Sequence, residues 1–373
     1  MKRNHQYYIQ ILLSTLNSGV ASVRNGNFIH SCYTKHTTII SVFLMFIGIN
    51  TFSQDIHFSQ FNEIQLNNNP ALAGNSESTK RAGLIYRNQW NSVSTPFQSS
   101  AFFGDIKLAP KLLKGDALGV GILVLNDRSG SGGLKQNHLI GMINYQKFID
   151  TERRMLVAAG LQLGVFQKGY DPTKLNFESD YSYATASFAN NSSGQALGKT
   201  STTSPEVGLG ACFTFFNERG KTSSIGFSFS HLTTPQQSFL GNDDPLKIKT
   251  TIHAKTVKRL KDNLHFYPMA LVMLQKEATS YIGGGQFVYS LGRALLEQTD
   301  LKAGVFYRYS DALFFTAGLN HDNWGLNFGY DYNISELGEA TKNVNAFEIA
   351  ISIRNRLFKN QNRKFIIPGN RLL

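Results

Sequence analysis

The residue types that most often carry chemistry are scattered along this chain. Its nine histidines and two cysteines form no cluster with metal-ligand spacing, and the sequence contains no G-x-S-x-G elbow, Walker loop or H-E-x-x-H pair. The run Gly283–Gly285 stands between Tyr281 and Phe287, where a bend or close packing within a strand explains it better than a phosphate cradle. We therefore predict a protein without enzymatic activity, bound metal or cofactor.

Charged residues in the second half of the chain instead share one face of alternating stretches. The members are Lys302, Arg308, Asp331, Glu348 and Arg354. Inside a barrel such charges can pair with each other, whereas facing lipid would be costly. We predict that they point inward and form structural pairs.

The stretches that carry these charges alternate with a period of two. The last one places Phe347, Ile349, Ile351 and Ile353 on one face, and small or polar residues on the other. Fourteen such stretches of about ten residues lie between Arg81 and Arg354, separated by turns. An even number of alternating segments is typical of an outer-membrane β-barrel.

A soluble β-sandwich alternates in the same way, with its apolar face turned inward, so alternation does not separate the two folds. No Pro- or Ser-rich linker interrupts the hairpins after residue 81, which favours one closed sheet. A hydrophobic content of 42% and a mean hydropathy of −0.20 also suit a barrel, which needs no long apolar run. We predict an all-β protein, a transmembrane antiparallel β-barrel of about 14 strands over residues 81–354.

The N-terminus has the pattern of an export signal. The apolar stretch from Ile39 to Ile49 follows four positive charges and is too short to span a bilayer, so residues 1–53 read as a long signal peptide that ends after Ser53. Cys32 leaves with this leader. Cys212 then stays alone in a predicted strand, and we expect no intramolecular disulfide.

Residues 54–80 precede the first strand. Within them the run Asn67–Gly74 contains Pro70, which biases Asn69 toward an extended backbone, and ends in a glycine that permits a positive φ. The run therefore predicts a tight, ordered turn. We expect this segment to plug the lumen or form a periplasmic lip, with Asn69 and Pro70 as candidate partner contacts.

With an even strand count, both chain ends lie on the periplasmic side, and the connections after odd-numbered strands face outward. Residues 170–204 then form the longest outward loop, which suits the usual pattern of long outer and short inner connections. This loop places aromatic side chains in a polar background, a composition that favours protein capture. The candidate partner-binding residues are Tyr170, Tyr181, Tyr183 and Phe188.

Arg87 and Trp90 close the first stretch, near the expected outer interface. Aromatic residues are common anchors at membrane interfaces. We predict that both residues anchor the barrel there.

The inward rim and residues 355–373, a basic periplasmic tail, collect positive charge in a chain with a pI of about 9.5. The candidate residues are Lys107, Lys111, Lys114, Lys258, Arg259, Lys261, Arg363 and Lys364. Two interpretations stay open: a solvated collar, or a docking surface for an acidic periplasmic partner. No recognition helix or RNA-binding signature is present, so we expect no nucleic-acid partner.

Three segments carry a family resemblance. They are QDIHFSQFNEIQLNNNPALAG (54–74), RAGLIYRNQWNSVSTPFQSSAFFGD (81–105) and FYRYSDALFFTAGLNHDNWGLNFGYDYNISEL (306–337). HFSQF, the NPALAG turn, YRNQW and YRYSDA together resemble the PorP/SprF family of type IX secretion system outer-membrane proteins from Bacteroidetes. The leader is longer than that of a typical member.

The resemblance implies a barrel in the outer membrane of a Gram-negative bacterium, in contact with its lipid. It also implies a role in secretion or cell-surface attachment of gliding adhesins through their C-terminal domains, and contacts with periplasmic type IX components. Barrel physics alone would also allow a channel or porin-like transporter for small solutes. Filling of the lumen distinguishes the two, because many inward positions are Gly, Ala or Ser and leave room.

Overall fold

The computed structural model describes residues 55–356 except 77, 91–94, 109–112, 114, 131, 176–180, 183–186, 189–199, 218–221, 240–243, 277, 292–298, 322 and 336–343. All of them belong to one compact unit, Ser53–Leu373. None of the helices in this part of the chain is long and apolar enough to cross a bilayer.

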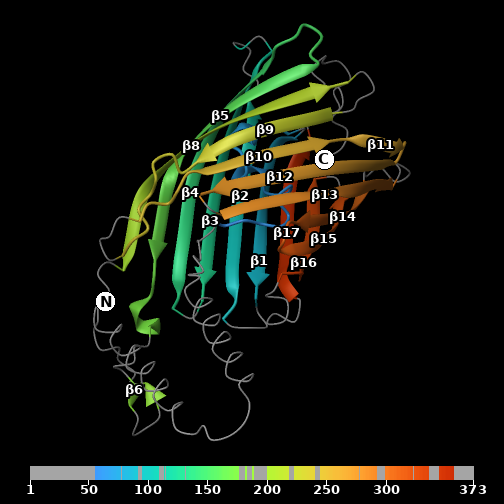
Figure 1. Cartoon of the computed structure of the whole chain (residues 1–373). Coiled ribbons are helices and arrows are strands. Elements are labelled where there is room, and N and C mark those ends of the chain that lie inside the picture. The colour runs from blue at the N-terminus through green and yellow to red at the C-terminus, as the bar shows by residue number, and fades with distance from the viewer. Residues whose placement is uncertain are drawn as a thin grey trace, which may run out of the picture. The chain divides into compact units, whose positions relative to one another are not determined.

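Strands make up most of the described chain (Figure 1). The strands of the first half are β1 (Ser78–Gln89), β2 (Phe97–Leu108), β3 (Ala117–Ser129), β4 (Leu134–Phe148), β5 (Met155–Gly169), β6 (Tyr181–Ser182), β7 (Ser187–Phe188), β8 (Ser201–Phe216) and β9 (Thr222–Ser230). Those of the second half are β10 (Lys249–Thr256), β11 (Lys258–Lys261), β12 (Leu264–Gln275), β13 (Ala278–Leu291), β14 (Thr299–Arg308), β15 (Ala312–His321), β16 (Trp324–Asn333) and β17 (Val344–Arg356).

Among the described residues, 14 antiparallel strands close into a barrel, as the alternation predicted. Closure comes from two pairings: β1 lies beside β17 as well as β2, and β10 lies beside both β9 and β12. Short β11 extends one end of β12, and β6 and β7 form a separate two-stranded sheet. A closed sheet leaves no unpaired edge, which is what a lipid-embedded wall requires.

The two faces of the wall separate by side-chain type. Leu84 and Ile353 are 58% and 61% exposed on the outer face, whereas Ile85 is 2% exposed on the inner face. In β17 the alternation predicted from the sequence is confirmed, because Phe347 is exposed and Glu348 is buried. The predicted lumenal charges also face inward.

We call the end of the barrel where β1 begins and β17 ends the inward end. The other, outward end carries the connections after β5 and β9, which span residues 170–200 and 231–248. The connection after β5 contains the 3₁₀ turn η4 (Pro172–Lys174) and the β6–β7 hairpin. Long connections gather at one end, as expected for an outer-membrane barrel.

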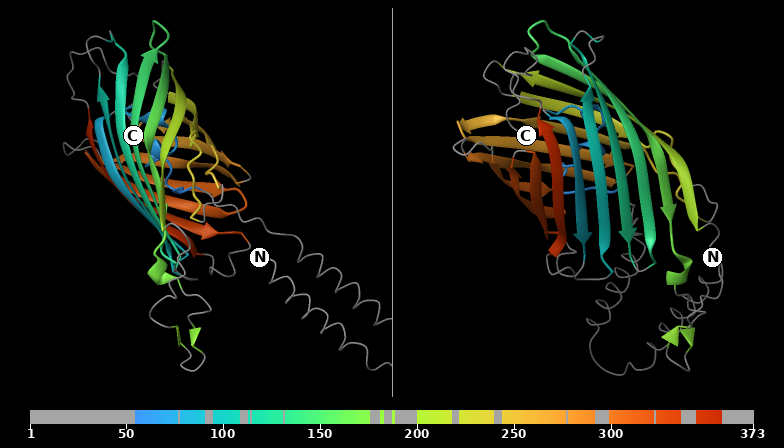
Figure 2. Two further views of the ribbon diagram at one scale, coloured as in Figure 1. Left: turned by 90° about the vertical axis from the view of Figure 1, so that its left-hand side faces the viewer. Right: turned by 180° about the vertical axis from the view of Figure 1, so that it is seen from behind.

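Residues 55–76, named here the lumen segment, lie between the walls of the barrel, where Figure 2 shows their blue trace. Two 3₁₀ turns, η1 (Gln65–Asn67) and η2 (Pro70–Leu72), give the segment its local structure. The Asn69 side chain accepts a hydrogen bond from the Ala71 amide and so caps η2, while Gly74 has a φ of +61°. The predicted tight turn at this run is therefore present.

Candidate functional site

The lumen segment packs its apolar side chains into the barrel wall. Phe58, Ile64 and Leu66 are at most 2% exposed and lie in one cluster with inward residues of the first strands, such as Phe103. Phe61 belongs to a second cluster on the other side of the lumen. Its ring meets the Phe306 ring edge-on, with centroids 5.6 Å apart. Burial of each such side chain contributes about 1.5–3 kcal/mol to stability, so these contacts hold the lumen segment against the wall.

Two wall glycines allow the backbone of the lumen segment to approach the sheet closely. A Cβ atom at Gly160 of β5 would collide with the backbone of Pro70 and Ala71, and one at Gly119 of β3 would collide with the carbonyl of Ala73. Side chains larger than hydrogen are therefore excluded where the NPALAG turn meets the wall.

Polar side chains of the wall satisfy the backbone of this turn. The Asn144 amide donates to the carbonyl oxygens of Ala71 and Ala73, at 2.7 and 2.9 Å. The Gly74 N–H donates to Asp105 Oδ2 at 2.8 Å. Asn69 Nδ2 donates to the Ala211 carbonyl at 3.0 Å. The turn thus has few polar atoms left for another partner.

A buried charge network joins Ser59 of the lumen segment to four strands, β1, β14, β16 and β17. Arg87 Nη1 lies 2.7 Å from Glu348 Oε1, and Arg308 Nη2 lies 2.6 Å from Asp331 Oδ2. Ser59 joins both carboxylates, because its N–H donates to Glu348 at 2.7 Å and its hydroxyl donates to Asp331 at 2.6 Å. The sequence-based expectation of Arg87 as an interface anchor was wrong. In the strand period Arg87 shares the inward face with Ile85, and its guanidinium is paired in the lumen.

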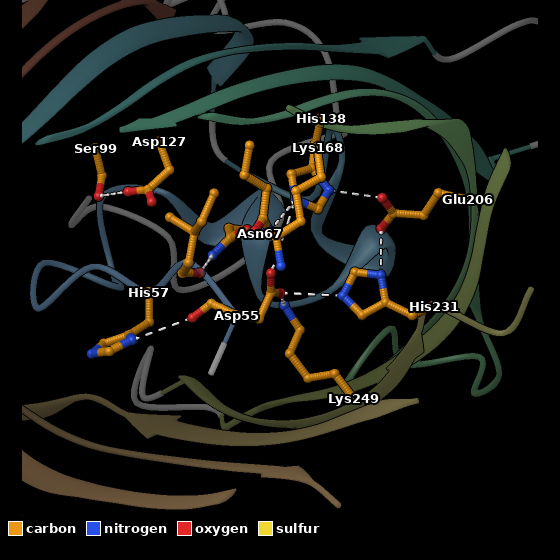
Figure 3. Close-up of polar contacts among 12 residues, drawn as sticks. Asp55, His57, Asn67, Ser99, Asp127, His138, Lys168, Glu206, His231 and Lys249 are labelled. Carbon is orange, nitrogen blue, oxygen red and sulfur yellow. Dashed lines mark hydrogen bonds and ion pairs between the residues drawn. The ribbon is translucent and has the colours of Figure 1, made fainter. Parts of the chain in front are cut away.

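A second network holds the start of the lumen segment, near the outward end (Figure 3). Asp55 pairs with Lys249, and its Oδ2 lies 3.2 Å from His231 Nε2. Glu206 lies beyond them, with its carboxylate 3.2 Å from His231 Nδ1 and 2.8 Å from His138 Nδ1. These acids and bases pair with one another. Within the described residues, no grouping of His, Cys, Asp and Glu side chains could hold a metal ion.

The charges in this second network shift two pKa values. Burial alone would raise the pKa of Asp55, but Lys249 and His231 hold it well below its usual range. Burial alone would lower the pKa of His231, yet the nearby Asp55 and Glu206 carboxylates raise it to about 9. Both groups are thus charged near neutral pH and attract each other.

The lumen segment runs from the outward end to the inward end. Asp55 contacts Lys249 and Gln275, which lie at the outward ends of β10 and β12. Its last residues lie at the inward end, where Lys107 Nζ donates to the Ser76 carbonyl at 2.9 Å. The segment therefore crosses much of the barrel length before β1 begins.

A small cavity of about 60 Å³ lies beside the lumen segment. Its lining includes Glu63, Lys302 and Arg354, and Lys302 Nζ lies 3.0 Å from Glu63 Oε1. Even this space is bordered by paired charges.

The candidate partner residues of the outward loop are only partly brought together. Tyr170 follows β5 and packs against Phe239, with ring centroids 4.9 Å apart. Tyr181 lies opposite Phe188 in the backbone register of the β6–β7 hairpin. Tyr183 lies outside the described residues. Asn69 and Pro70, by contrast, are buried against the barrel wall.

The structure describes four of the eight candidate residues of the basic rim. Lys258, Arg259 and Lys261 are all exposed on β11, at the inward end, where Arg259 pairs with the exposed Asp262 at 2.6 Å. Lys107 instead holds the end of the lumen segment. Lys111, Lys114, Arg363 and Lys364 lie outside the described residues.

The sequence did not predict the network around Asp55. Asp55, His138 and Glu206 are far apart in the chain, and only strand pairing brings them together. The available signal was charge on the inward face: His138 and Glu206 alternate with the lipid-facing Leu139 and Val207 of their strands.

Comparison with solved structures found similar barrels. The toluene transporter TbuX of Ralstonia pickettii is 10% identical, with a TM-score of 0.46, and the match covers 79% of this chain and 94% of that one. The toluene transporter TodX of P. putida is 11% identical, with a TM-score of 0.45 and coverage of 78% and 93%. Comparison with curated protein sequences found no match.

The family model for the type IX secretion system membrane protein PorP/SprF matches residues 50–353. This match spans the lumen segment and nearly the whole barrel. The chain therefore belongs to the PorP/SprF family of type IX secretion system membrane proteins, and it resides in the outer membrane.

Proposed function

We propose that this protein is a closed platform of the type IX secretion system, which binds the C-terminal domain of a secreted gliding adhesin at its outward end and supports its secretion or surface attachment. The filled lumen carries this proposal. A barrel with a sealed interior offers its two ends and its outer wall to partners, and the proposed role needs no catalytic step.

The amount of buried contact supports a closed interior. Ser59 and Gln60 are tied to Glu348 through their backbone N–H groups, and Asp55 is tied to Lys249. Breaking a buried pair by losing one partner costs about 3–5 kcal/mol, so release of the lumen segment is unfavourable. We therefore place cargo binding outside the lumen.

The outward loops supply the surface that we assign to the cargo. The β6–β7 hairpin and the Tyr170–Phe239 pair add aromatic groups to the long connections after β5 and β9. Aromatic side chains are enriched in the cores of protein interfaces. These groups suit the binding of a folded domain.

Capture of a cargo C-terminal domain by the purified barrel in detergent tests this assignment. The double substitution Tyr170→Ser and Tyr181→Ser should weaken binding about five- to thirtyfold, as expected for loss of interface aromatics. Tyr309→Ser is the matched control, because Tyr309 is an exposed tyrosine in a different outward turn. Equal binding by the double variant and the control would contradict the assignment, and absence of capture by the folded wild type would contradict cargo binding itself.

The inward end supplies a second surface, for an acidic periplasmic component of the secretion system. Lys258 and Lys261 are exposed on β11 beside Arg259, and like charges on one hairpin attract an opposite surface. Lys258→Glu with Lys261→Glu should abolish co-purification of such a component. Lys80→Glu with Lys147→Glu makes the same charge change on the outer wall of the inward end and should leave it intact.

A second candidate function is a channel for small solutes, for which the cavity beside Glu63 and Lys302 would be part of a path. The cavity is small and its charges are paired. Solute flux through the purified barrel separates the two functions.

A further inference from the structure

Two cations lie directly opposite each other on neighbouring strands of the outer wall. Arg128 of β3 pairs in register with Lys135 of β4, close to the outward end, and both side chains are exposed. They share the outward-facing period with the lipid-exposed Val124 and Leu139. Like charges directly opposite on a sheet destabilise it. Such a pair is expected where an anion offsets the repulsion.

Within the described chain, neither Arg128 nor Lys135 forms an ion pair with an acidic side chain. Asp127, the neighbouring acid, faces the lumen side and accepts hydrogen bonds from Ser99 at 2.5 Å and Ser129 at 2.9 Å. Figure 3 shows the first of these contacts. Asp171, at the start of the loop turn, has an interaction of its own. Among described residues, Arg128 and Lys135 therefore lack an anionic partner.

A third cation completes a pocket at this place. Lys174 of η4, in the connection after β5, lines a cavity of about 270 Å³ together with Arg128, Lys135, Gln98 and Thr95. Lys174 comes from a different element than the two strand residues. The fold thus brings three positive charges from separate parts of the chain to one hollow on the outside of the barrel.

The outer wall below this hollow changes in layers. The lowest layer is the exposed apolar row Phe102, Val124, Leu139 and Val165. Above it lies an amide row, in which Asn126 donates to Asn137 at 2.5 Å and Asn137 donates to Gln167 at 3.2 Å. The cations form the top row. This order of apolar, amide and cationic groups matches the order of acyl chains, sugar and phosphate in a phosphorylated glycolipid.

We propose that the hollow formed by Arg128, Lys135 and Lys174 binds the phosphorylated headgroup of a glycolipid in the outer leaflet of the outer membrane. The Arg guanidinium can hold phosphate oxygens in a bidentate manner, and the two lysines add point charges. The amide row hydrogen-bonds the sugar, and the apolar row lies along the acyl chains. This end of the barrel is assigned to the outer leaflet because it carries the long connections, which face the cell exterior in outer-membrane barrels. This site is independent of the proposed cargo binding.

The test measures retention of a defined lipid by the full-length barrel, purified in detergent and checked for β-structure by circular dichroism. The probes are lipid A with its phosphates, the same lipid A after enzymatic dephosphorylation, and phosphatidylglycerol, each titrated and followed by native mass spectrometry. Arg128→Gln with Lys135→Gln should weaken binding of phosphorylated lipid A at least about tenfold, since each cation near a membrane surface contributes roughly fivefold. Dephosphorylated lipid A should bind the wild type as weakly as phosphorylated lipid A binds the double variant.

Lys80→Gln with Lys147→Gln is the matched control. It removes the same charge from the outer wall at the inward end, with Lys147 on the same strand as Lys135. The control should bind phosphorylated lipid A like the wild type. Equal binding by wild type and the Arg128/Lys135 variant would overturn the proposal. Two other results would also overturn it. One is that the wild type binds phosphatidylglycerol as tightly as phosphorylated lipid A, and the other is that millimolar inorganic phosphate displaces the bound lipid A.

Discussion

At the scale of single residues, Glu348 ties the lumen segment to the wall most directly. Its two carboxylate oxygens accept the backbone N–H groups of Ser59 and Gln60, and one of them also meets the Arg87 guanidinium. Hydrogen bonds to charged groups are about twice as strong as neutral ones, and a buried charge that loses its partner is costly. One side chain therefore joins two strands and the segment.

Glu348→Gln should lower the free energy of unfolding by about 2–4 kcal/mol, because Arg87 keeps its charge in the buried site while its main partner becomes neutral. The measurement is the urea midpoint of the folded barrel in detergent. Glu152→Gln is the control: Glu152 is paired with Arg154 at 2.8 Å, but both side chains are more than half exposed. Exposed pairs contribute little, so the control should change by less than about 1 kcal/mol. Equal effects of the two substitutions would contradict the assigned role of Glu348.

The pair of Asp55 and His231 predicts a dependence on pH. The pKa of His231 is raised from 6.5 to about 9 in the folded protein, so its contribution is fully present below pH 6.5 and is lost as the pH rises to 9. That contribution is about 3 kcal/mol at most. Asp55 acts in the opposite direction, because its lowered pKa means that its contribution is lost only in acid.

The free energy of unfolding should therefore be lower at pH 9 than at pH 6.5. His231→Gln should reduce this difference, because glutamine keeps a hydrogen-bonding group but does not titrate. The groups that face His231 are Asp55, Glu206, Lys249 and His138, and all of them stay in the variant. An unchanged pH difference in the variant would show that other groups cause it.

At the scale of elements, the lumen segment packs closely against the wall strands because glycines stand at the points of contact. Gly160 of β5 and Gly119 of β3 lie against the NPALAG turn, where the turn backbone occupies the space of a Cβ atom. Glycine in a strand usually weakens it, which is tolerated where another backbone must approach closely. The role of these two glycines is therefore to let the lumen segment pack against the wall, and not to stabilise their strands.

Gly160→Ala should displace the turn and expose the lumen segment to protease, while the barrel itself still forms. The matched control is Gly104→Ala of β2, where an added Cβ would meet its nearest neighbour at 3.7 Å, an ordinary contact. Limited proteolysis followed by mass spectrometry of the N-terminal fragments distinguishes the two. Equally slow cleavage within residues 55–76 in both variants would show that the close approach at Gly160 does not hold the turn in place.

At the scale of the whole barrel, width decides whether the interior can be closed. Barrels of 8 strands fill their interior with side chains, whereas those of 16–18 strands leave an aqueous channel. With 14 strands, this barrel lies between the two cases. Its inward side chains include many small residues, and the lumen segment fills the remaining space with Phe58, Phe61, Ile64 and Leu66.

Liposomes that contain the wild-type barrel should therefore swell slowly in small sugars, near the rate of empty liposomes. Deletion of residues 55–74 should increase swelling strongly, because the filling is removed while the strands remain. Heat-modifiable migration on gels checks that the deleted protein is folded, and Gly104→Ala serves as a folded control with an intact segment. Porin-like swelling by the wild type would favour the channel function over the closed platform.

The fold class and the family were predictable from the order of residues alone. Period-two alternation needs only neighbouring residues in the chain, so Phe347 and Glu348 could be assigned to opposite faces without coordinates. The strand number followed from the same count, and the motifs HFSQF, NPALAG and YRNQW identified the family. The inward direction of Arg308 and Asp331 was also predictable, because a charge facing lipid is costly.

The pairing of the inward groups, by contrast, depends on how the whole chain folds. Asp55 and Lys249 are separated by 194 residues, and Arg87 and Glu348 by 261. Their pairing depends on strand register, barrel closure and the path of the lumen segment, and none of these is contained in local periodicity. The same holds for Arg128, Lys135 and Lys174, because the loop after β5 must fold back over β3 and β4 before the three charges share one hollow. Local physics assigns a side chain to a face, and long-range closure assigns it a partner.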